Sequence, residues 1–268
     1  MVHNGAMPKN DGLKITILGS GTSTGVPMPG CDCPVCHSEN PRNHRLRTSA
    51  LITFRGKNIL IDVGPDFRQQ MLTAKVAQID AVVFTHAHAD HVLGVDDLRV
   101  YNFKLNGPIP CYGTKDTLDQ IKRIFYYVFD RDPRHMGGSV ANLDLHPFEN
   151  FESLNLFGLV ITPFPLVHGN VAVTGFRFGN FAYATDCKAI SDEARACLAG
   201  IDVMVLDGLR EKEHPTHMTI AQAIETGEKL GVKKLYLIHM SHSVEYEEMS
   251  KTLPGWVELA YDGLELNL

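Results

Sequence analysis

Three histidines and an aspartate stand within six residues of the sequence, in the segment 85–91, which reads Thr-His-Ala-His-Ala-Asp-His. This segment directly follows residues 81–84, an apolar run that predicts a buried strand. Imidazole nitrogen and carboxylate oxygen suit zinc, manganese, iron or nickel. Ligands this close in sequence do not converge comfortably on one ion, so the pattern favours two neighbouring metals that divide the set His86, His88, Asp90 and His91. The alternatives, a polar surface loop or a histidine-rich buffering tract, leave the preceding strand unexplained.

A second group of candidate ligands comprises Cys31, Cys33 and Cys36. In a reducing compartment such a cluster is more often a metal site than a disulfide framework. A thioredoxin-like redox motif is the alternative, but the run Cys-Asp-Cys-Pro-Val-Cys lacks the strand-to-helix setting of that motif. His37 is one candidate for a fourth ligand, although a residue adjacent to Cys36 reaches the same ion awkwardly. The other cysteines are predicted to be small apolar fillers of the core.

The composition of the chain limits the kinds of partner and the cellular location that can be expected. The chain has 268 residues, of which 44% are hydrophobic, which is enough for a full core. The net charge of −6 argues against a long nucleic acid as partner, because phosphate contacts need a basic face. There is no apolar stretch of about 18 residues, so a membrane span is not expected. Residues 1–12 lack the apolar core of a signal peptide and are predicted to be a flexible leader of a cytoplasmic protein.

Strands and helices interleave along the chain. Apolar β-branched runs predict strands at 13–18, 49–54, 58–61, 81–84, 156–162, 171–178, 181–185, 203–206 and 235–238. Helical periodicity is found at 67–74, 114–128, 191–198, 219–230 and 244–252, with Ser191 and Thr219 as predicted caps. The charged segment 131–138 is predicted to be a long loop near the site. The absence of a linker predicts one α/β domain over residues 13–268, in which helices cover a sandwich of mixed sheets.

The motif His-x-His-x-Asp-His after a hydrophobic strand resembles the signature of the metallo-β-lactamase superfamily. The resemblance implies a four-layer αββα sandwich of two mixed β-sheets. It also implies four further site residues, each at the end of an apolar run: Asp62, His168, Asp186 and His239. Asp62 would support the site without binding metal. By the same resemblance, one metal is held by His86, His88 and His168, the other by Asp90, His91 and His239, and Asp186 bridges the two.

The resemblance implies a hydrolase with two divalent ions, zinc or manganese. Two ions about 3.5–4 Å apart lower the pKa of a shared water toward about 7 and so supply hydroxide at neutral pH. The expected catalytic residues are Asp90, which is also a ligand, and His217, whose role is implied by a narrower resemblance to a cyclic phosphodiesterase family. Imidazole is suited to protonate a leaving alkoxide near neutral pH. His214, three residues before His217, is the rival for this role.

Residues in the N-terminal third of the chain indicate a narrower family within this superfamily. The glycine-rich run 19–27, followed by Cys31, Cys33 and Cys36, is similar to the cyclic phosphodiesterase family of the carbon–phosphorus lyase pathway. This similarity implies that the three cysteines and His242 hold one structural zinc in a closed tetrahedral site. The glycine-rich run is not a phosphate-binding P-loop, because no Gly-Lys-Ser/Thr follows.

The predicted function is therefore hydrolysis of a small or cyclic phosphodiester by a dinuclear metal site. The expected partners are that substrate and a second copy of the chain in a homodimer, but neither a membrane nor a long nucleic acid. Three alternatives stay open: a tRNA 3′-processing endoribonuclease, an ester, lactone or thiolester hydrolase of the same superfamily, and a non-catalytic metal-binding protein. The basic run 42–47 is the only one that would suit RNA, and a solvated loop is its ordinary interpretation.

Overall fold

Two seven-stranded mixed sheets lie at the centre of the computed structural model, which describes residues 12–105, 107–130 and 139–268. The first sheet has the order β14-β1-β2-β3-β4-β5-β6, with bounds Glu265–Asn267, Leu13–Gly19, Ser49–Phe54, Lys57–Ile61, Ala81–Val83, Ile109–Gly113 and Leu143–Pro147. The second has the order β13-β12-β11-β10-β9-β8-β7, with bounds Val257–Leu259, Lys234–Ile238, Val203–Asp207, Phe181–Ala184, Val171–Phe178, Leu159–His168 and Leu154–Leu156.

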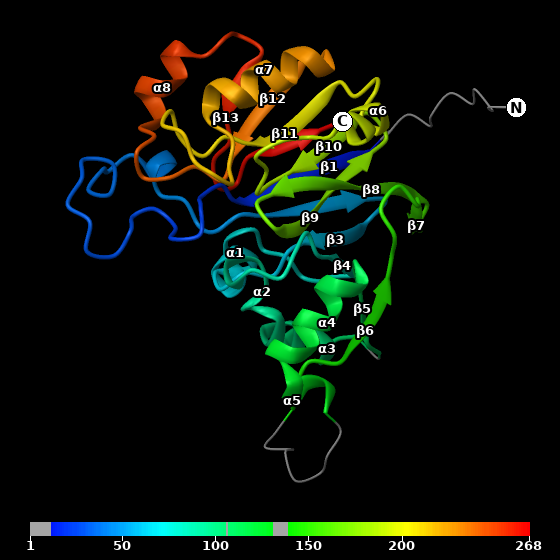
Figure 1. Ribbon diagram of the computed structural model, residues 1–268. Helices are drawn as coiled ribbons and strands as arrows, with labels where there is room; N and C mark the ends of the chain where they lie inside the picture. Colours follow the sequence, from blue (N-terminus) through cyan, green and yellow to red (C-terminus); the bar gives the residue numbers. More distant parts are fainter. Residues whose placement is uncertain (1–11, 106, 131–138) are drawn as a thin grey trace, which may run out of the picture.

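Helices cover the outer face of each sheet (Figure 1). One helical layer comprises α1 to α5, with bounds Phe67–Thr73, Ala89–Val92, Arg99–Asn102, Lys115–Ile124 and Tyr126–Phe129. The opposite layer comprises α6, α7 and α8, with bounds Asp192–Cys197, Ile220–Leu230 and Tyr246–Thr252. Two 3₁₀ helices, η1 and η2, span Pro41–Asn43 and Val95–Leu98. The predicted four-layer αββα sandwich is confirmed.

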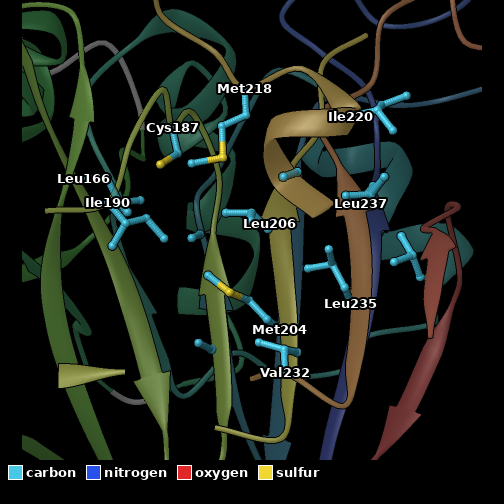
Figure 2. Close-up of a cluster of buried hydrophobic side chains, with 14 of the residues drawn as sticks. Leu166, Cys187, Ile190, Met204, Leu206, Met218, Ile220, Val232, Leu235 and Leu237 are labelled. Atoms are coloured by element: carbon cyan, nitrogen blue, oxygen red, sulfur yellow. The ribbon is translucent and has the colours of Figure 1, made fainter. Parts of the chain in front are cut away.

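Alternating side chains explain why the strands bury both faces. On β10, Phe181 and Tyr183 pack between the two sheets, while Ala182 and Ala184 face the outer helices. The small alanines leave room on that side for larger residues of the neighbouring strands. Figure 2 shows the resulting outer cluster, in which side chains of β11 and β12 lie near Ile220 of α7. Each face of the second sheet therefore has its own apolar core.

The strand and helix predictions hold where the periodic run is long. Strands 49–54 and 171–178 have the predicted bounds, and the turn at Gly179 joins β9 to antiparallel β10. The Ser191 hydroxyl accepts from the Ala194 N–H, and Thr219 forms a capping box with Gln222, so both predicted caps are confirmed.

Two predicted elements are wrong in their bounds. The strand predicted at 156–162 is instead a hairpin between β7 and β8, because Phe157 and Gly158 both have positive φ and turn the chain. The helix predicted at 114–128 is divided at Phe125, whose φ of −107° and ψ of 42° interrupt the helix. The loop predicted at 131–138 and residues 1–11 of the predicted leader lie outside the described residues.

The described part of the chain contains no helix that is both long and apolar enough to cross a membrane. The cytoplasmic location stays a prediction.

Candidate metal centre

The predicted metal ligands meet at strand ends from both sheets. His86 and His88 follow β4, and α2 then presents Asp90 and His91. The second sheet contributes three residues from the ends of β8, β10 and β12: His168, Asp186 and His239. Because loops at strand ends are held by a rigid scaffold, these side chains can be fixed before any ligand binds.

Three site residues adopt the left-handed backbone conformation that L-residues rarely use. The φ angles of Asp62, Asp186 and His239 are 62°, 52° and 63°. Each of these residues comes directly after a strand or one residue later, where this conformation turns the side chain out of the strand's alternation. Such strain persists only where the surrounding structure imposes it, and it is concentrated at functional sites.

The seven predicted ligands form two groups that share one carboxylate. The ligand atoms of each group lie within 4.8 Å of one another. Asp186 belongs to both groups, which are otherwise formed by His86, His88 and His168, and by Asp90, His91 and His239. The structure thus brings together the two sets and the shared residue that the sequence indicated. Their binding of metal stays a prediction.

Hydrogen bonds outside the two groups orient the ligands. Asp62 is fully buried and accepts from His91 Nδ1 at 2.7 Å. The backbone N–H and the hydroxyl of Thr85 donate to the same carboxylate at 2.8 and 2.7 Å. The carbonyl of Thr216 lies 2.9 Å from His168 Nδ1. Each partner fixes one ring nitrogen and leaves Nε2 directed at the site, as in known carboxylate–histidine–metal arrangements.

The buried ring nitrogens fit a metal-binding role. The Nε2 atoms of His86, His91 and His239 are buried and have no hydrogen-bond partner among the residues that the structure describes. His91 Nε2 lies 3.1 Å from an Asp186 oxygen without the geometry of a hydrogen bond. An unsatisfied buried polar atom is costly, so several that converge on shared carboxylates require a further group between them. A divalent ion matches this set of nitrogen and oxygen donors.

The protonation states of His86, His168 and Asp186 suit the same role. His91 and His239 differ, because the charge of Asp186 raises the pKa of both rings although burial opposes it. Burial, together with the charge of His91, holds the pKa of His86 well below its usual range, and burial lowers the pKa of His168. Although burial opposes it, the charges of His239 and His91 hold the pKa of Asp186 well below its usual range. Neutral imidazole and ionised carboxylate are the forms that bind metal.

His217 lies beside both ligand groups and is oriented by a buried carboxylate. Its Nδ1 is 2.7 Å from an Asp207 oxygen that also accepts from the Cys187 N–H. The His217 ring stacks on His239 and meets His168 edge-on, with centroid distances of 4.7 Å in both cases. With Nδ1 bound to Asp207, Nε2 is the atom free to give up or take a proton.

Two further observations concern the residues near His217. The rival His214 has no comparable carboxylate, since its Nδ1 accepts from the Thr216 N–H at 3.3 Å. Asp207 itself was not among the predicted site residues. Its position directly after the apolar run 203–206 was the available signal. Asp62 also follows an apolar run, but it was the family resemblance that implied its role.

The three clustered cysteines lie beside His242, as predicted. His242 Nδ1 is 3.2 Å from Cys31 Sγ and 3.4 Å from Cys33 Sγ, and Cys36 completes a group whose ligand atoms lie within 4.8 Å. The alternative ligand His37 is exposed and lies 3.6 Å from an Asp32 oxygen instead. The group matches the Cys₃His composition of closed structural zinc sites.

Comparison with known proteins assigns the chain to a family. Residues 57–240, more than half of the chain, match a family model described as a β-lactamase superfamily domain. The chain belongs to the β-lactamase superfamily. It is also similar to a solved protein described as a new diphosphatase from the PhnP family. The two are 41% identical, with a TM-score of 0.88 and coverage of 96% of this chain and 98% of that one. The superfamily resemblance inferred from the sequence is confirmed.

Two other proteins are similar to this superfamily protein, one in sequence over part of its length and one in fold. An octanoyltransferase of Porphyromonas gingivalis is 41% identical over 257 residues, which are 94% of this chain but 51% of that protein. Because the chain spans about half the length of this relative, the relative's activity does not carry over. Zinc-bound PqqB from Methylobacterium extorquens has a TM-score of 0.74 at 20% identity, covering 95% of this chain and 100% of that one, which shows a common fold.

Replacing Cys33 with alanine is expected to remove one zinc from this β-lactamase superfamily protein and to destabilise it. The group links the loop 31–36 to the segment that contains His239 and His242. A metal at 100 times its Kd stabilises the folded state by about 2.7 kcal/mol, and this contribution would be lost. Metal analysis and denaturant unfolding measure the two effects, with Cys197→Ala as a control outside the group. An unchanged zinc content together with unchanged stability would contradict a structural zinc here.

The cysteine thiols should also differ in reactivity once metal has been removed. The backbone N–H of Cys36 lowers the pKa of Cys33 to about 6, whereas burial raises the pKa of Cys36 to about 11. Because the thiolate is the nucleophile, alkylation of Cys33 should accelerate as pH rises through about 6 and then level off. Cys36 should react only in alkaline solution. Peptide mass spectrometry after timed iodoacetamide treatment distinguishes them, and equal pH profiles would be the contrary result.

Proposed function

We propose that the chain is a dinuclear metal-dependent phosphodiesterase that acts on a small or cyclic phosphodiester. The observation that carries this proposal is the Asp207–His217 pair, which stands beside both ligand groups. Cleavage of a phosphodiester to an alkoxide needs a proton for the leaving oxygen, and an oriented imidazole supplies it. The pair therefore adds to the superfamily site an imidazole that can protonate a leaving alkoxide.

The ligand groups fit two divalent ions of zinc or manganese type. We assign His86, His88 and His168 to one ion and Asp90, His91 and His239 to the other, with Asp186 shared. Two such ions, when bound, would supply hydroxide at neutral pH and would offset negative charge on an attacked phosphoryl group. The Cys31, Cys33, Cys36 and His242 group is assigned to one structural zinc.

The chain's own residues position the reacting groups and move the proton. Asp207 holds the His217 Nδ1 proton, which leaves Nε2 as the atom that can donate to the departing oxygen. Asp62 and Thr85 keep His91 in one orientation through a buried hydrogen-bond network. This network fixes the ring in the orientation that directs Nε2 toward the carboxylates of the site.

The contacts of the basic run 42–47 support a small substrate. Arg45 is buried and donates to the carbonyls of Ser241 and Val244 at 3.2 and 2.8 Å. The Arg42 guanidinium lies over the rings of Tyr246 and Tyr261 at 4.7 and 4.5 Å. These arginines hold the segment after His239 in place. Arg45 is therefore not available to RNA phosphates, and Arg42 already contacts two aromatic rings, which supports the choice of a small substrate.

An assay series tests the proposal. The metal-loaded protein is offered bis(p-nitrophenyl) phosphate and 2′,3′-cyclic nucleotides, beside a carboxylic ester and a lactone. We expect turnover of the phosphodiesters and little or none of the other two. Hydrolysis of the ester or lactone with no phosphodiester turnover would overturn the assignment. Failure on all substrates by protein with its full metal content would favour a non-catalytic metal-binding role.

A second candidate is hydrolysis of a diphosphate linkage, because the PhnP-family relative is described as a diphosphatase and is 41% identical along nearly its whole length. The two substrates differ in the leaving group, since phosphate leaves more readily than an alkoxide. Comparing kcat/KM for a cyclic nucleotide with that for a dinucleoside diphosphate distinguishes the candidates. The larger value identifies the preferred bond.

A further inference from the structure

Arg47 is the third arginine of the basic run 42–47, and it lies at the edge of the first sheet that carries the metal centre. It stands two residues before β2, which is antiparallel to both β1 and β3. The start of β2 therefore lies beside the ends of β1 and β3, and Asp62 directly follows β3. Arg55, which directly follows β2, lies at the opposite edge of the same sheet.

The backbone of Arg47 is held by residues at the start of α1, close to the ligand Asp90. Its N–H donates to an Asp66 oxygen at 2.7 Å, and its carbonyl accepts from the Gln70 side chain at 2.8 Å. Gly64 separates Arg47 from the metal centre. A Cβ at Gly64 would collide with the Asp90 carbonyl oxygen and would lie 4.0 Å from Arg47 Cβ. Only the glycine backbone therefore stands between Arg47 and a predicted ligand.

The guanidinium group of Arg47 has N–H donors left for a ligand. Nη1 lies 3.2 Å from an Asp66 oxygen, and 30% of the Arg47 side chain is exposed. Nε is buried and has no hydrogen-bond partner among the described residues. Arg45, by contrast, donates to two backbone carbonyls. Because a guanidinium has five donors in a planar fork, Arg47 can pair with Asp66 and still bind a phosphate oxygen.

A turn in the glycine-rich run 19–27 lies against the guanidinium. The Gly25 N–H donates to the Thr22 carbonyl at 2.8 Å, and the φ of Gly25 is 64°, which favours glycine. A Cβ at Gly25 would lie 3.5 Å from Arg47 Nη1. The same turn is joined to the metal centre, because the Thr22 N–H donates at 3.1 Å to the carbonyl of Met240, which directly follows a predicted ligand. Arg47 therefore lies between two segments that are both attached to the centre.

We propose that Arg47 is a specificity-determining residue that binds the second phosphoryl group of a diphosphate substrate. This inference rests on the function proposed above and concerns its second substrate class. In hydrolysis of a diphosphate, the oxygen of a water that loses a proton bonds to the attacked phosphorus, and the bond from that phosphorus to the bridging oxygen breaks. The bridging oxygen takes the electron pair and departs with the second phosphoryl group as phosphate. Arg47 offsets the charge of this departing anion. A cyclic phosphodiester releases only an alkoxide, which Arg47 does not assist.

Binding of two phosphonates tests the proposal without any turnover. The metal-loaded protein is titrated with methylenediphosphonate, which has two phosphoryl groups, and with methylphosphonate, which has one. Arg47→Gln should weaken binding of methylenediphosphonate by about tenfold or more, because a charge-assisted hydrogen bond is lost, and should leave binding of methylphosphonate unchanged. Arg47→Lys keeps the charge without the planar fork and should give an intermediate loss. Arg55→Gln removes an arginine from the opposite end of β2 and should change neither affinity.

Kinetics extend the test to the two substrate classes. Arg47→Gln should lower kcat/KM for a dinucleoside diphosphate by about tenfold or more and leave that for a 2′,3′-cyclic nucleotide unchanged. Metal analysis and circular dichroism confirm that each variant is folded, and Arg47→Lys decides if the glutamine variant loses metal. Equal changes in affinity for both phosphonates, or no change in either, would overturn the proposal. A protein that hydrolyses neither substrate but whose preference for methylenediphosphonate depends on Arg47 would support it and overturn only the proposed function.

Discussion

Asp186→Ala is expected to lower kcat/KM on a phosphodiester by more than about 100-fold, since loss of a residue that merely supports a ligand already costs 10–100-fold. Asp186 is the one residue common to both ligand groups, so its removal affects both proposed ions at once. Metal analysis should find about three ions per chain in wild type, two of them at the catalytic site. In the variant the catalytic metal should be lost, while the zinc at the cysteine group stays bound.

A matched control for this variant is Asp192→Ala. Asp192 is an exposed carboxylate on α6 that pairs only with Arg195 among the described residues. It should keep wild-type activity and metal content, which would exclude a general effect of removing an aspartate. An Asp186→Ala protein that retained all its metal and activity would show that Asp186 does not bridge the site.

His217→Ala is expected to have an effect that depends on the leaving group. On a 2′,3′-cyclic nucleotide, which releases an alkoxide, kcat should fall by about 10²–10⁴-fold because the general acid is lost. On bis(p-nitrophenyl) phosphate the fall should be far smaller, since p-nitrophenolate departs without a proton. Steady-state kinetics on the two substrates measure the difference, and metal content should stay at the wild-type value.

Two companion variants identify the source of this effect. Asp207→Asn should show a smaller loss with the same substrate dependence, because Asp207 acts by orienting His217. His214→Ala should change neither rate by much, since no carboxylate orients that ring. An equal fall in kcat on both substrates for His217→Ala would assign the residue a structural role. It would also remove the main support for the proposal that the enzyme protonates a leaving alkoxide.

The sequence was most informative where chemistry and periodicity coincide. His86 could be selected from its residue type and its place after an apolar run, whereas His168 and Asp186, which also end apolar runs, were implied by the family resemblance. The grouping of these residues into two ligand sets came from the family resemblance rather than from spacing. The structure supplies the same grouping independently, through distances between atoms that are far apart in the chain.

The role of Asp207 could not be predicted because it depends on strand register. β11 and β12 are parallel, with Asp207 paired to Ile238, so Asp207 stands next to His239. A shift of the register by one residue would turn Asp207 away, and no local pattern specifies the register. The same limit applies to β14, a three-residue strand near the end of the chain that pairs with β1 near its start. Such short strands have too few residues for a periodic signal.

The close sequence spacing of His239 and His242 has a thermodynamic consequence. One short segment contributes a residue to the proposed catalytic pair and another to the proposed zinc site, and buried Arg45 fixes that segment through the Ser241 and Val244 carbonyls. Whatever free energy zinc contributes by ordering this segment also favours occupancy of the catalytic pair. Linkage makes this relation reciprocal, so a filled catalytic pair must tighten the zinc site by the same factor. Removal of metal from either site should therefore weaken the affinity of the other site without emptying it.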